Sequence, residues 1–425
     1  MRKTRRIQFA ICLAVVLAGF LVAGQFPGRI QCVAAAGSYA GPDPATASGY
    51  RVLKPIESGD LTLFPVVRSD GRAPQGSQFL TLDEGFKSGE VEVTEAGKVR
   101  GLVRSRGGAT PTTRYQGDQV NTLVLVNNSN RPLLLLAGEI VTGGKQDRII
   151  AKDRIVPAGA DPIDLSVFCV EHGRWTESSS KFGAAGGGAV GSFMVQPKVR
   201  QQAMVAKSQQ QVWDSVDGAI TTMAAAAAKP AAPPPPVAGR SESVTVTAET
   251  VTVTNGSIAD LPMNGRIMSG SASLGTTSYA KAMQNKAVSA KVDQETASLV
   301  QSREQALTTL RQEHAVGVVV AVRGEIIWAD LFSDPELLAR YWTKLVRSYA
   351  AEGLASGPAH KSATVADAQS FLDAPSHGRE DSEGEVGIYR YREVRTSSTD
   401  LFSLESLLPG TGFDVHISKL KIKGA

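Results

Sequence analysis

Cysteine and histidine are scarce in this sequence. Three cysteines occur in 425 residues, and two of them, Cys12 and Cys32, precede residue 37. Once that N-terminal segment is removed on export, Cys169 stands alone and no intrachain disulfide can form. The five histidines show no paired ligand spacing, and a single thiolate cannot build a metal site. We therefore expect neither a disulfide nor a bound metal.

Several short motifs that identify enzymes or nucleic-acid binders are also missing. Gly143-Gly144 has neither the Walker nor the dinucleotide-binding spacing. No serine-hydrolase nucleophile elbow is present, and His172 has no Ser or Asp companion at a recognisable spacing. Residues 1–36 contain only basic charged residues, so their removal turns the net charge of +4 into about −1. We expect no cofactor and no nucleic-acid partner.

The only long apolar run lies near the N-terminus. MRKTRR is basic, residues 7–23 are almost wholly apolar, and the alanines at 34–36 precede a glycine. This order predicts a secretory signal peptide over residues 1–36, and hence export to the periplasm or the medium. An uncleaved inner-membrane anchor is the alternative, since the run approaches the length of a span. Residues 37–50 are expected to form a flexible leader.

Short strands recur through the first half of the chain. Residues 61–67, 91–93 and 121–130 are rich in apolar and β-branched residues, and residues 163–169 alternate with period two. The alternation places Cys169 on the inward side, as a buried structural thiol. Short strands at intervals of about ten residues predict an antiparallel sheet that resembles a β-sandwich.

Helical periodicity appears in three segments. Apolar residues recur at intervals of three and four over 198–220, 279–314 and 335–350, and Trp213 lies in the apolar stripe of the first. Residues 317–332 predict a β-hairpin. The whole pattern predicts an α+β fold, with two or three long helices packed on the sheet and with disordered insertions.

The domain organisation follows from composition. The main domain is predicted in two parts, 51–223 and 279–355, around an insertion at 224–278 that is first Pro/Ala-rich and then alternates Val and Thr. We expect the insertion to be disordered, and contact with envelope proteins is one role for it. A linker at 356–385 and C-terminal strands at 386–425 complete the chain.

Charged residues gather between residues 138 and 175. Glu139 and Glu171 are carboxylates at strand ends, which suits acid–base chemistry, or alternatively ion pairing with neighbouring Lys and Arg. Arginine forks and an amide suit a phosphate or sugar. The candidates for ligand binding are Lys145, Gln146, Arg148, His172, Arg174 and Trp175. We expect all of these groups to meet at one end of the same β-layer.

Several motifs in this region resemble a known family. GEIVTGGKQDR (138–148), VPAG (156–159), CVEHGRW (169–175) and AVGVVVAVRGEIIWADLFSDPELLARYWTKLVRSYA (315–350) resemble the bacterial ARG and rhodanese-phosphatase-superfamily-associated domain. The resemblance covers roughly residues 51–216 and 286–355. The family is named after neighbouring genes for ADP-ribosyl glycohydrolases and rhodanese-phosphatase-like proteins, and it implies no reaction for the domain itself.

Three functions are compatible with these patterns. The first is an exported binding or accessory domain that recognises a phosphorylated or ADP-ribose-like ligand. The second is a hydrolase with Glu139 and Glu171 as its acid and base. The third is a structural envelope protein that interacts through residues 224–278. Contact with the membrane is expected only through the N-terminal segment.

Overall fold

The structure is a computed structural model, and it describes residues 49–69, 78–96, 122–174, 176–186, 193–228, 273–296, 299, 310, 312–354, 362–409, 411 and 413–422. The predicted signal peptide, the leader up to residue 48, Trp175 and residues 229–272 of the predicted insertion lie outside this part. The chain divides into the units Met1–Ala40 and Gly41–Ala425, and every described residue belongs to the second.

Six short strands close into a barrel, in the order β11, β6, β5, β12, β8, β9, and every neighbouring pair is antiparallel. Their bounds are Val91–Glu95 for β5, Thr122–Asn127 for β6, Ile140–Thr142 for β8, Arg148–Ile150 for β9, Ile163–Cys169 for β11 and Lys181–Ala184 for β12. Val141 and Ile150 pack inside the barrel. Ile140 and Ile149 pack outside it against the helices, because successive side chains of a strand point to opposite faces.

Three further strands, which lie between the barrel strands in the sequence or just before them, form a small separate sheet in the order β10, β7, β4. The strands are Arg154–Val156 (β10), Leu133–Leu135 (β7) and Leu80–Thr81 (β4). Helix α2 (Leu82–Ser88) follows β4 directly. Thr81 and Glu84 form a capping box at its start, in which each side chain binds the other residue's backbone N–H.

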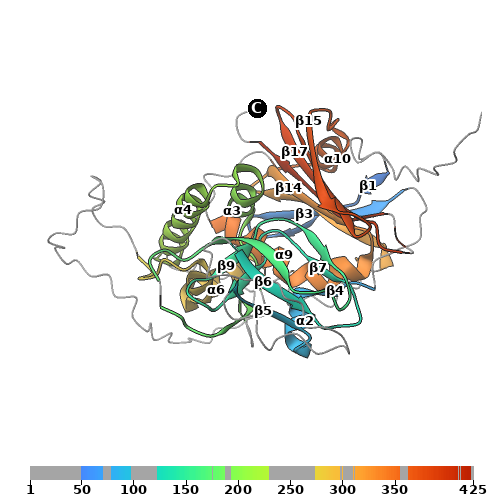
Figure 1. The fold of residues 1–425 in the computed structure, drawn as a ribbon. Coiled ribbons are helices and arrows are strands. Elements are labelled where there is room, and N and C mark those ends of the chain that lie inside the picture. Colours follow the sequence, from blue (N-terminus) through green and yellow to red (C-terminus); the bar gives the residue numbers. More distant parts are fainter. Residues whose placement is uncertain are drawn as a thin grey trace, which may run out of the picture. The chain divides into compact units, whose positions relative to one another are not determined.

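A second, larger sheet has nine strands in the order β1-β3-β13-β14-β18-β17-β16-β15, with β2 paired to β3, all antiparallel. The bounds are Tyr50–Val52 (β1), Ile56–Ser58 (β2), Leu61–Arg68 (β3), Ala315–Val322 (β13), Glu325–Phe332 (β14), Arg379–Glu385 (β15), Tyr389–Arg395 (β16), Thr399–Ser406 (β17) and Asp414–Lys421 (β18). Figure 1 shows β14 in orange and the later strands in red. The C-terminal strands therefore belong to the same sheet as the predicted hairpin, β13–β14.

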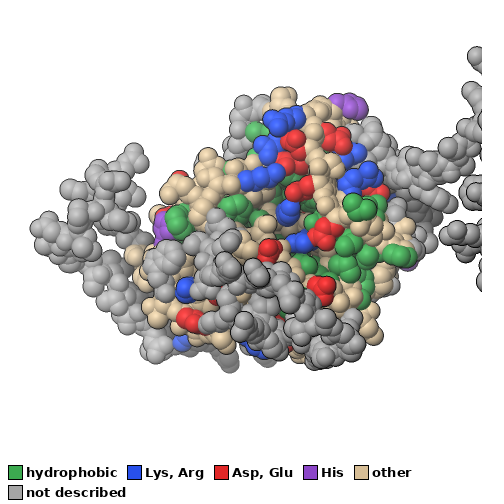
Figure 2. Space-filling model, in the orientation of Figure 1, with side chains coloured by type: hydrophobic (Ala, Val, Ile, Leu, Met, Phe, Trp, Pro, Cys, Tyr) green, Lys and Arg blue, Asp and Glu red, His purple; other side chains and the backbone are tan. Residues whose placement is uncertain are grey.

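Both faces of this sheet are buried at its centre. Val318 and Val320 of β13 pack on one face with the long helix α9 (Pro335–Leu354). Val319 and Ala321 pack on the other face with Phe371 of α10 (Val365–Asp373). Alternation along one strand thus feeds two separate cores. Towards the β15 edge of the sheet, Figure 2 shows Lys/Arg and Asp/Glu side chains interleaved over β15 and β17. Arg392 of β16 pairs with Glu380 of β15.

Two of the predicted helices are divided. Residues 198–220 form α3 (Pro197–Gln201), the π-helical turn η3 (Gln202–Ala206) and α4 (Gln209–Ala228). The break follows from Lys207, whose φ of 52° is left-handed and cannot continue a right-handed helix. The break shifts the buried face, so Val212 and Val216 are buried while Trp213 is only half-buried. Trp213 is therefore not the core anchor that the apolar stripe predicts.

Residues 279–314 also start as two helices. Asn285 ends α5 (Tyr279–Gln284) and caps α6 (Lys286–Glu295) through its side-chain oxygen. By contrast, α9 is one helix of 20 residues. It begins where Asp334-Pro335-Glu336 predicts, and the Glu336 N–H donates to Asp334 at 2.7 Å.

The fold differs from the sequence-based expectation in two further ways. A closed barrel stands in place of one of the facing sheets of a sandwich, although the mixture of helices with antiparallel sheets is confirmed. The predicted linker at 356–385 contains α10, whose apolar residues pack on a face of the large sheet, and β15, the strand at its edge. Within the described residues, no helix combines the length and hydropathy needed to cross a membrane.

Candidate functional site

The barrel has two chemically different ends. We call one the rim end: the C-terminal ends of β5, β8 and β11 lie there beside the N-terminal ends of β6, β9 and β12, as the strand registers require. We call the opposite end, where β8 starts and β9 ends, the anchored end. Lys145, Gln146, Arg148, Glu171, His172 and Arg174 all belong to the rim end by this register. Glu139, which precedes β8, belongs to the anchored end.

A tight turn between β8 and β9 shapes the rim end. Gly143 has φ 140° and Gly144 has φ 50°, which are left-handed conformations that glycine adopts without strain. A Cβ atom on Gly144 would lie 2.3 Å from the Phe182 ring and 2.7 Å from Glu95 Oε1. Only glycine fits here, so the GG pair in the sequence has a structural reason.

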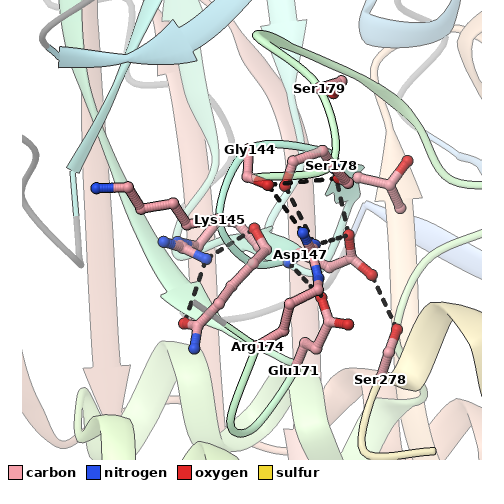
Figure 3. Close-up of polar contacts among 12 residues, drawn as sticks. Gly144, Lys145, Asp147, Glu171, Arg174, Ser178, Ser179 and Ser278 are labelled. Carbon is pink, nitrogen blue, oxygen red and sulfur yellow. Dashed lines mark hydrogen bonds and ion pairs between the residues drawn. The ribbon is translucent and has the colours of Figure 1, made fainter. Parts of the chain in front are cut away.

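Arg174 clamps this turn to the segment after β11. Its Nε donates to Glu171 Oε2 at 2.7 Å, its Nη2 lies 3.4 Å from Asp147 Oδ1, and its Nη1 donates to the Gly144 carbonyl at 2.8 Å. Figure 3 shows Arg174 between the two carboxylates, with Lys145 extending away from them. Because Arg174 already binds two acids and backbone carbonyls, it holds the loop geometry.

The last residues of the predicted insertion, 273–278, have a defined structure, and they and the residues that follow them cross the same end. Ser278 Oγ donates to Asp147 Oδ2 at 2.8 Å, and Lys281 Nζ lies 3.0 Å from Glu171 Oε1. The Tyr279 N–H donates to the Val170 carbonyl at 3.1 Å. The sequence offers no signal for this contact, since more than a hundred residues separate the two segments.

The pKa values of the two rim carboxylates, Asp147 and Glu171, are shifted in opposite directions. Burial, followed by repulsion from Glu171, raises the pKa of Asp147, although Ser278 and Gly143 oppose this. Burial alone would also raise the pKa of Glu171, but hydrogen bonds from Arg174 and Lys281 outweigh it and hold that pKa below its ordinary value. Neighbouring carboxylates with diverging pKa values are a frequent feature of functional sites.

Beneath the clamp lies a second, buried polar layer. Glu95, Arg148 and Cys169 occupy the inward positions of β5, β9 and β11, two residues beyond Val93, Ile150 and Val167 of the barrel core. Arg148 Nη1 donates to the backbone oxygen of Gln146 at 2.7 Å. Burial raises the pKa of the Cys169 thiol to about 11, with Arg148 opposing and Glu95 adding to the shift. Cys169 is thus a buried thiol that stays protonated at neutral pH, as its position in the alternation predicts.

Gln146 is the exception in this layer. Its side chain is fully buried (0% exposed), yet its Nε2 atom has no hydrogen-bond partner among the described residues. A buried amide nitrogen without an acceptor costs roughly 1–3 kcal/mol. Such a group in a folded protein calls for a bound acceptor or a functional explanation.

His172 lies further out at the rim. Its ring packs edge-on against Trp213 with 4.1 Å between the centroids, and its Nδ1 lies 3.7 Å from Asp217. The His172 carbonyl accepts from Thr277 Oγ1 at 2.6 Å. His172 therefore links α4 to the rim, while Trp175, the remaining candidate, lies outside the described residues.

Glu139 lies in a separate cluster at the anchored end, in which Glu139 and Lys344 are buried. Its Oε1 atom lies 2.6 Å from Lys344 Nζ, which also lies 2.8 Å from Asp83 Oδ2. Burial raises the pKa of Glu139 against the pull of Lys344. Glu171 accepts from the Asp147 N–H just before β9, and the Glu139 carbonyl accepts from the Ile150 N–H at the end of β9. Asp147 and Ile150 are three positions apart on an extended chain, which is about 10 Å.

Glu139 and Glu171 therefore lie at opposite ends of β9, and each is paired with its own cation. This geometry does not fit the two as a cooperating acid and base.

A further cluster at the anchored end was not predicted from the sequence. Its six members are all buried and come from five parts of the chain, with two of them on β18: Asp153, Arg200, Asp330, Tyr349, His416 and Ser418. No short motif contains them, so spacing could not reveal the cluster. Lys419 of β18 is also buried: it is 2% exposed and donates to the Ala374 carbonyl at 2.7 Å.

The described residues contain no group of three or more His, Cys, Asp or Glu side chains placed to hold a metal ion. At the rim end, the available donors are amide, guanidinium and ammonium groups beside two paired carboxylates. This set is suited to hydrogen bonding with an oxyanion or a sugar.

Comparison with known proteins identifies the family. The model of the ARG and Rhodanese-Phosphatase-superfamily-associated Protein domain matches residues 49–419. The match extends beyond the motifs at 51–216 and 286–355 and includes most of the C-terminal strands. No curated protein and no solved structure matches the chain. The chain belongs to the ARG and Rhodanese-Phosphatase-superfamily-associated Protein domain family, ARPP-1.

Proposed function

We propose that this protein is an exported accessory domain whose rim end binds a phosphorylated or ADP-ribose-like small molecule. The single observation that carries the proposal is Gln146, a fully buried side chain with an unpartnered Nε2 in a glycine-shaped turn. An amide NH₂ in this position requires an acceptor oxygen, and a phosphate or ribose supplies several.

The surroundings of Gln146 support an anionic ligand. The Arg148 guanidinium lies directly beside it and donates to its backbone oxygen. Lys281 places an ammonium group at the rim with 58% of its side chain exposed. The ARG in the family's name, which stands for ADP-ribosyl glycohydrolase in the resemblance given above, is consistent with an ADP-ribose-like ligand.

Calorimetry tests this function. Titration with ADP-ribose, a sugar phosphate and inorganic phosphate is expected to release or absorb heat for at least one of them. Gln146→Met keeps the side-chain length and removes the amide, so it should weaken binding about tenfold or more, as the loss of a buried hydrogen bond does. An Arg148→Ala and Arg174→Ala double variant should abolish binding.

The matched control is Gln210→Met. Gln210 is exposed on α4 and bonds only Asp214 in the described part of the chain, so its replacement should leave the affinity unchanged. Absence of heat with all three compounds would end the proposal. Equal losses in the two methionine variants would show that the rim does not hold the ligand.

Export is the second component of the proposal. The basic, apolar and small-residue segments within residues 1–36 support it. Fractionation of cells that express the full chain, followed by N-terminal sequencing, should find the protein outside the cytoplasm with a new terminus near residue 37. An intact N-terminus in the membrane fraction would favour the anchor instead.

A further inference from the structure

His416 is enclosed between two carboxylates in the unpredicted cluster. Its Nδ1 lies 2.6 Å from Asp153 Oδ2, and its Nε2 lies 3.1 Å from Asp330 Oδ1. A neutral imidazole has one N–H, so it can donate to only one of two ionised carboxylates. Geometry alone therefore favours the doubly protonated ring.

The remaining members complete a balanced set of charges. Arg200 Nη1 donates to both oxygens of Asp330, at 2.9 and 3.0 Å, and its Nη2 donates to Ser418 Oγ at 2.9 Å. With His416 protonated, two cations face two anions, and His416, Asp153 and Asp330 are all 0% exposed. A buried ion keeps its charge only when it is paired.

The titratable and charged groups around His416 come from several elements. They are Asp153 from the link between β9 and β10, Asp330 from β14, Arg200 from α3, Tyr341 and Tyr349 from α9, and Tyr391 from β16. Phe332 packs its ring 4.6 Å from the imidazole. No other acid or base in the described residues contacts the ring, so Asp153 depends on His416 for its direct cation contact.

Asp153 connects this cluster to the barrel. Its Oδ1 atom accepts from the Ala137 N–H at 2.7 Å, just before β8 begins. The neighbouring Gly138 has φ 86°, and a Cβ there would lie 3.1 Å from Arg200 Cγ. The cluster thus links residues 137–138 and 153 of the barrel's anchored end to two strands of the large sheet.

We propose that His416 is a proton-dependent latch, which fastens the anchored end of the barrel to the large sheet while the ring is protonated and loosens it when the ring loses a proton. Loss of that proton leaves Asp153 as a buried anion with no cation in contact. The least costly relief is movement of the 151–153 link toward water, which also breaks the bond from the Ala137 N–H.

The electrostatics determine the direction of the response. Burial alone would lower the pKa of His416, but Asp153 and Asp330 outweigh it and raise that pKa above its ordinary value. A histidine whose pKa is higher in the folded state stabilises that state. The effect is complete at pH values below the pKa in the unfolded state, and it is lost as pH rises through the pKa in the folded state. The latch therefore holds at neutral and acidic pH and loosens on the alkaline side.

Two measurements on the unaltered chain test the latch. The first follows the His416 ring by NMR from about pH 6 to about pH 10, where histidine titrates. The second follows the hydrogen-exchange protection factor of the Ala137 amide over the same range. Protection is expected to fall about a hundredfold, as removal of one partner from a buried pair implies, with the midpoint at the His416 pKa.

Variants separate the latch from general unfolding. Asp153→Asn should lower the His416 pKa and remove the alkaline loss of Ala137 protection, because no buried anion then remains at position 153. His172→Gln removes a half-buried histidine at the other end of the barrel that also lies beside an aspartate, and it should change neither. A His416 ring that is neutral at pH 6, or an Ala137 amide whose protection does not change across the His416 titration, would overturn the proposal.

Discussion

The two ends of the barrel use the same residue types for different purposes. At the anchored end, Lys344 and His416 meet Glu139 and Asp153 in full burial. At the rim end, Arg174 is 19% exposed and pairs with Asp147 and Glu171, and Lys281 is 58% exposed and pairs with Glu171. At the anchored end the paired charges are buried and hold the elements in fixed positions. At the rim end the charges are partly exposed to water, so a ligand can compete for them.

This difference has an energetic basis. A buried charge that loses its partner cannot be solvated, so removal of one member of a buried pair costs about 3–5 kcal/mol. At a partly exposed site water takes over some of the lost contacts, and exposed pairs typically contribute about 1 kcal/mol or less. The comparison between the ends therefore makes quantitative predictions.

The largest effect is expected from Arg200→Met. It leaves Asp330 buried opposite a neutral side chain, so the free energy of unfolding in urea should fall by about 3–5 kcal/mol at pH 7. Arg174→Met at the rim should cost about 1–2 kcal/mol. If Arg174→Met proved as costly as Arg200→Met, the distinction between an anchored end and a rim end would fail.

An intermediate effect is expected at Glu139. Lys344→Met alone should destabilise by about 3 kcal/mol, because Glu139 and Asp83 lose their shared cation. Adding Glu139→Gln should restore part of that stability, giving a coupling energy of about 1–3 kcal/mol in a double-mutant cycle. Unfolding curves for the four proteins measure it, and strictly additive losses would show that the pair is not coupled.

The smallest effect is expected at Asp147. The negative charge of Asp147 is disfavoured by burial and by Glu171, and an Asn side chain can still accept the hydrogen bond from Ser278. Asp147→Asn should therefore change the free energy of unfolding by less than about 0.5 kcal/mol at pH 7. Glu171→Gln should cost about 1–2 kcal/mol, because two cations hold that charge.

The pH dependence of these two variants provides the check. The depressed pKa of Glu171 gives stability that is present above its unfolded-state pKa and lost as pH falls. The raised pKa of Asp147 makes its ionised form destabilising, so this residue's contribution to stability improves as pH falls. Urea unfolding measured at about pH 7 and about pH 4 should show that the difference in unfolding free energy between Asp147→Asn and Glu171→Gln is smaller at pH 4. A larger difference at pH 4 would contradict these pKa shifts.

Local rules of sequence account for much of the fold. The alternation of Leu165, Val167 and Cys169 placed those side chains in the barrel, and Asp334-Pro335 placed the start of α9. Both follow from interactions within a few residues. The division of the helix at Lys207 did not follow, because a left-handed residue flanked by good helix formers depends on what packs around it.

The candidate site was predictable only in part. The rim candidates Gln146, Arg148, Glu171 and Arg174 lie at one end of the barrel because they occupy a hairpin turn and the end of the adjacent strand. Glu139 lies at the other end, because it stands at the opposite end of the same short hairpin. Strand ends are visible in a sequence, but which ends meet depends on register.

By itself, the sequence determined the family, the strand and helix segments with strong periodicity, and the burial of Cys169, because these depend on local order and on side-chain chemistry. Only the tertiary structure decided that six strands close into a barrel, that Lys281 reaches Glu171, and that His416 lies between Asp153 and Asp330. The residues that form these contacts lie far apart along the chain. Packing of α5 on the rim end brings Lys281 to Glu171, and packing of the anchored end on the large sheet brings Asp153 to His416.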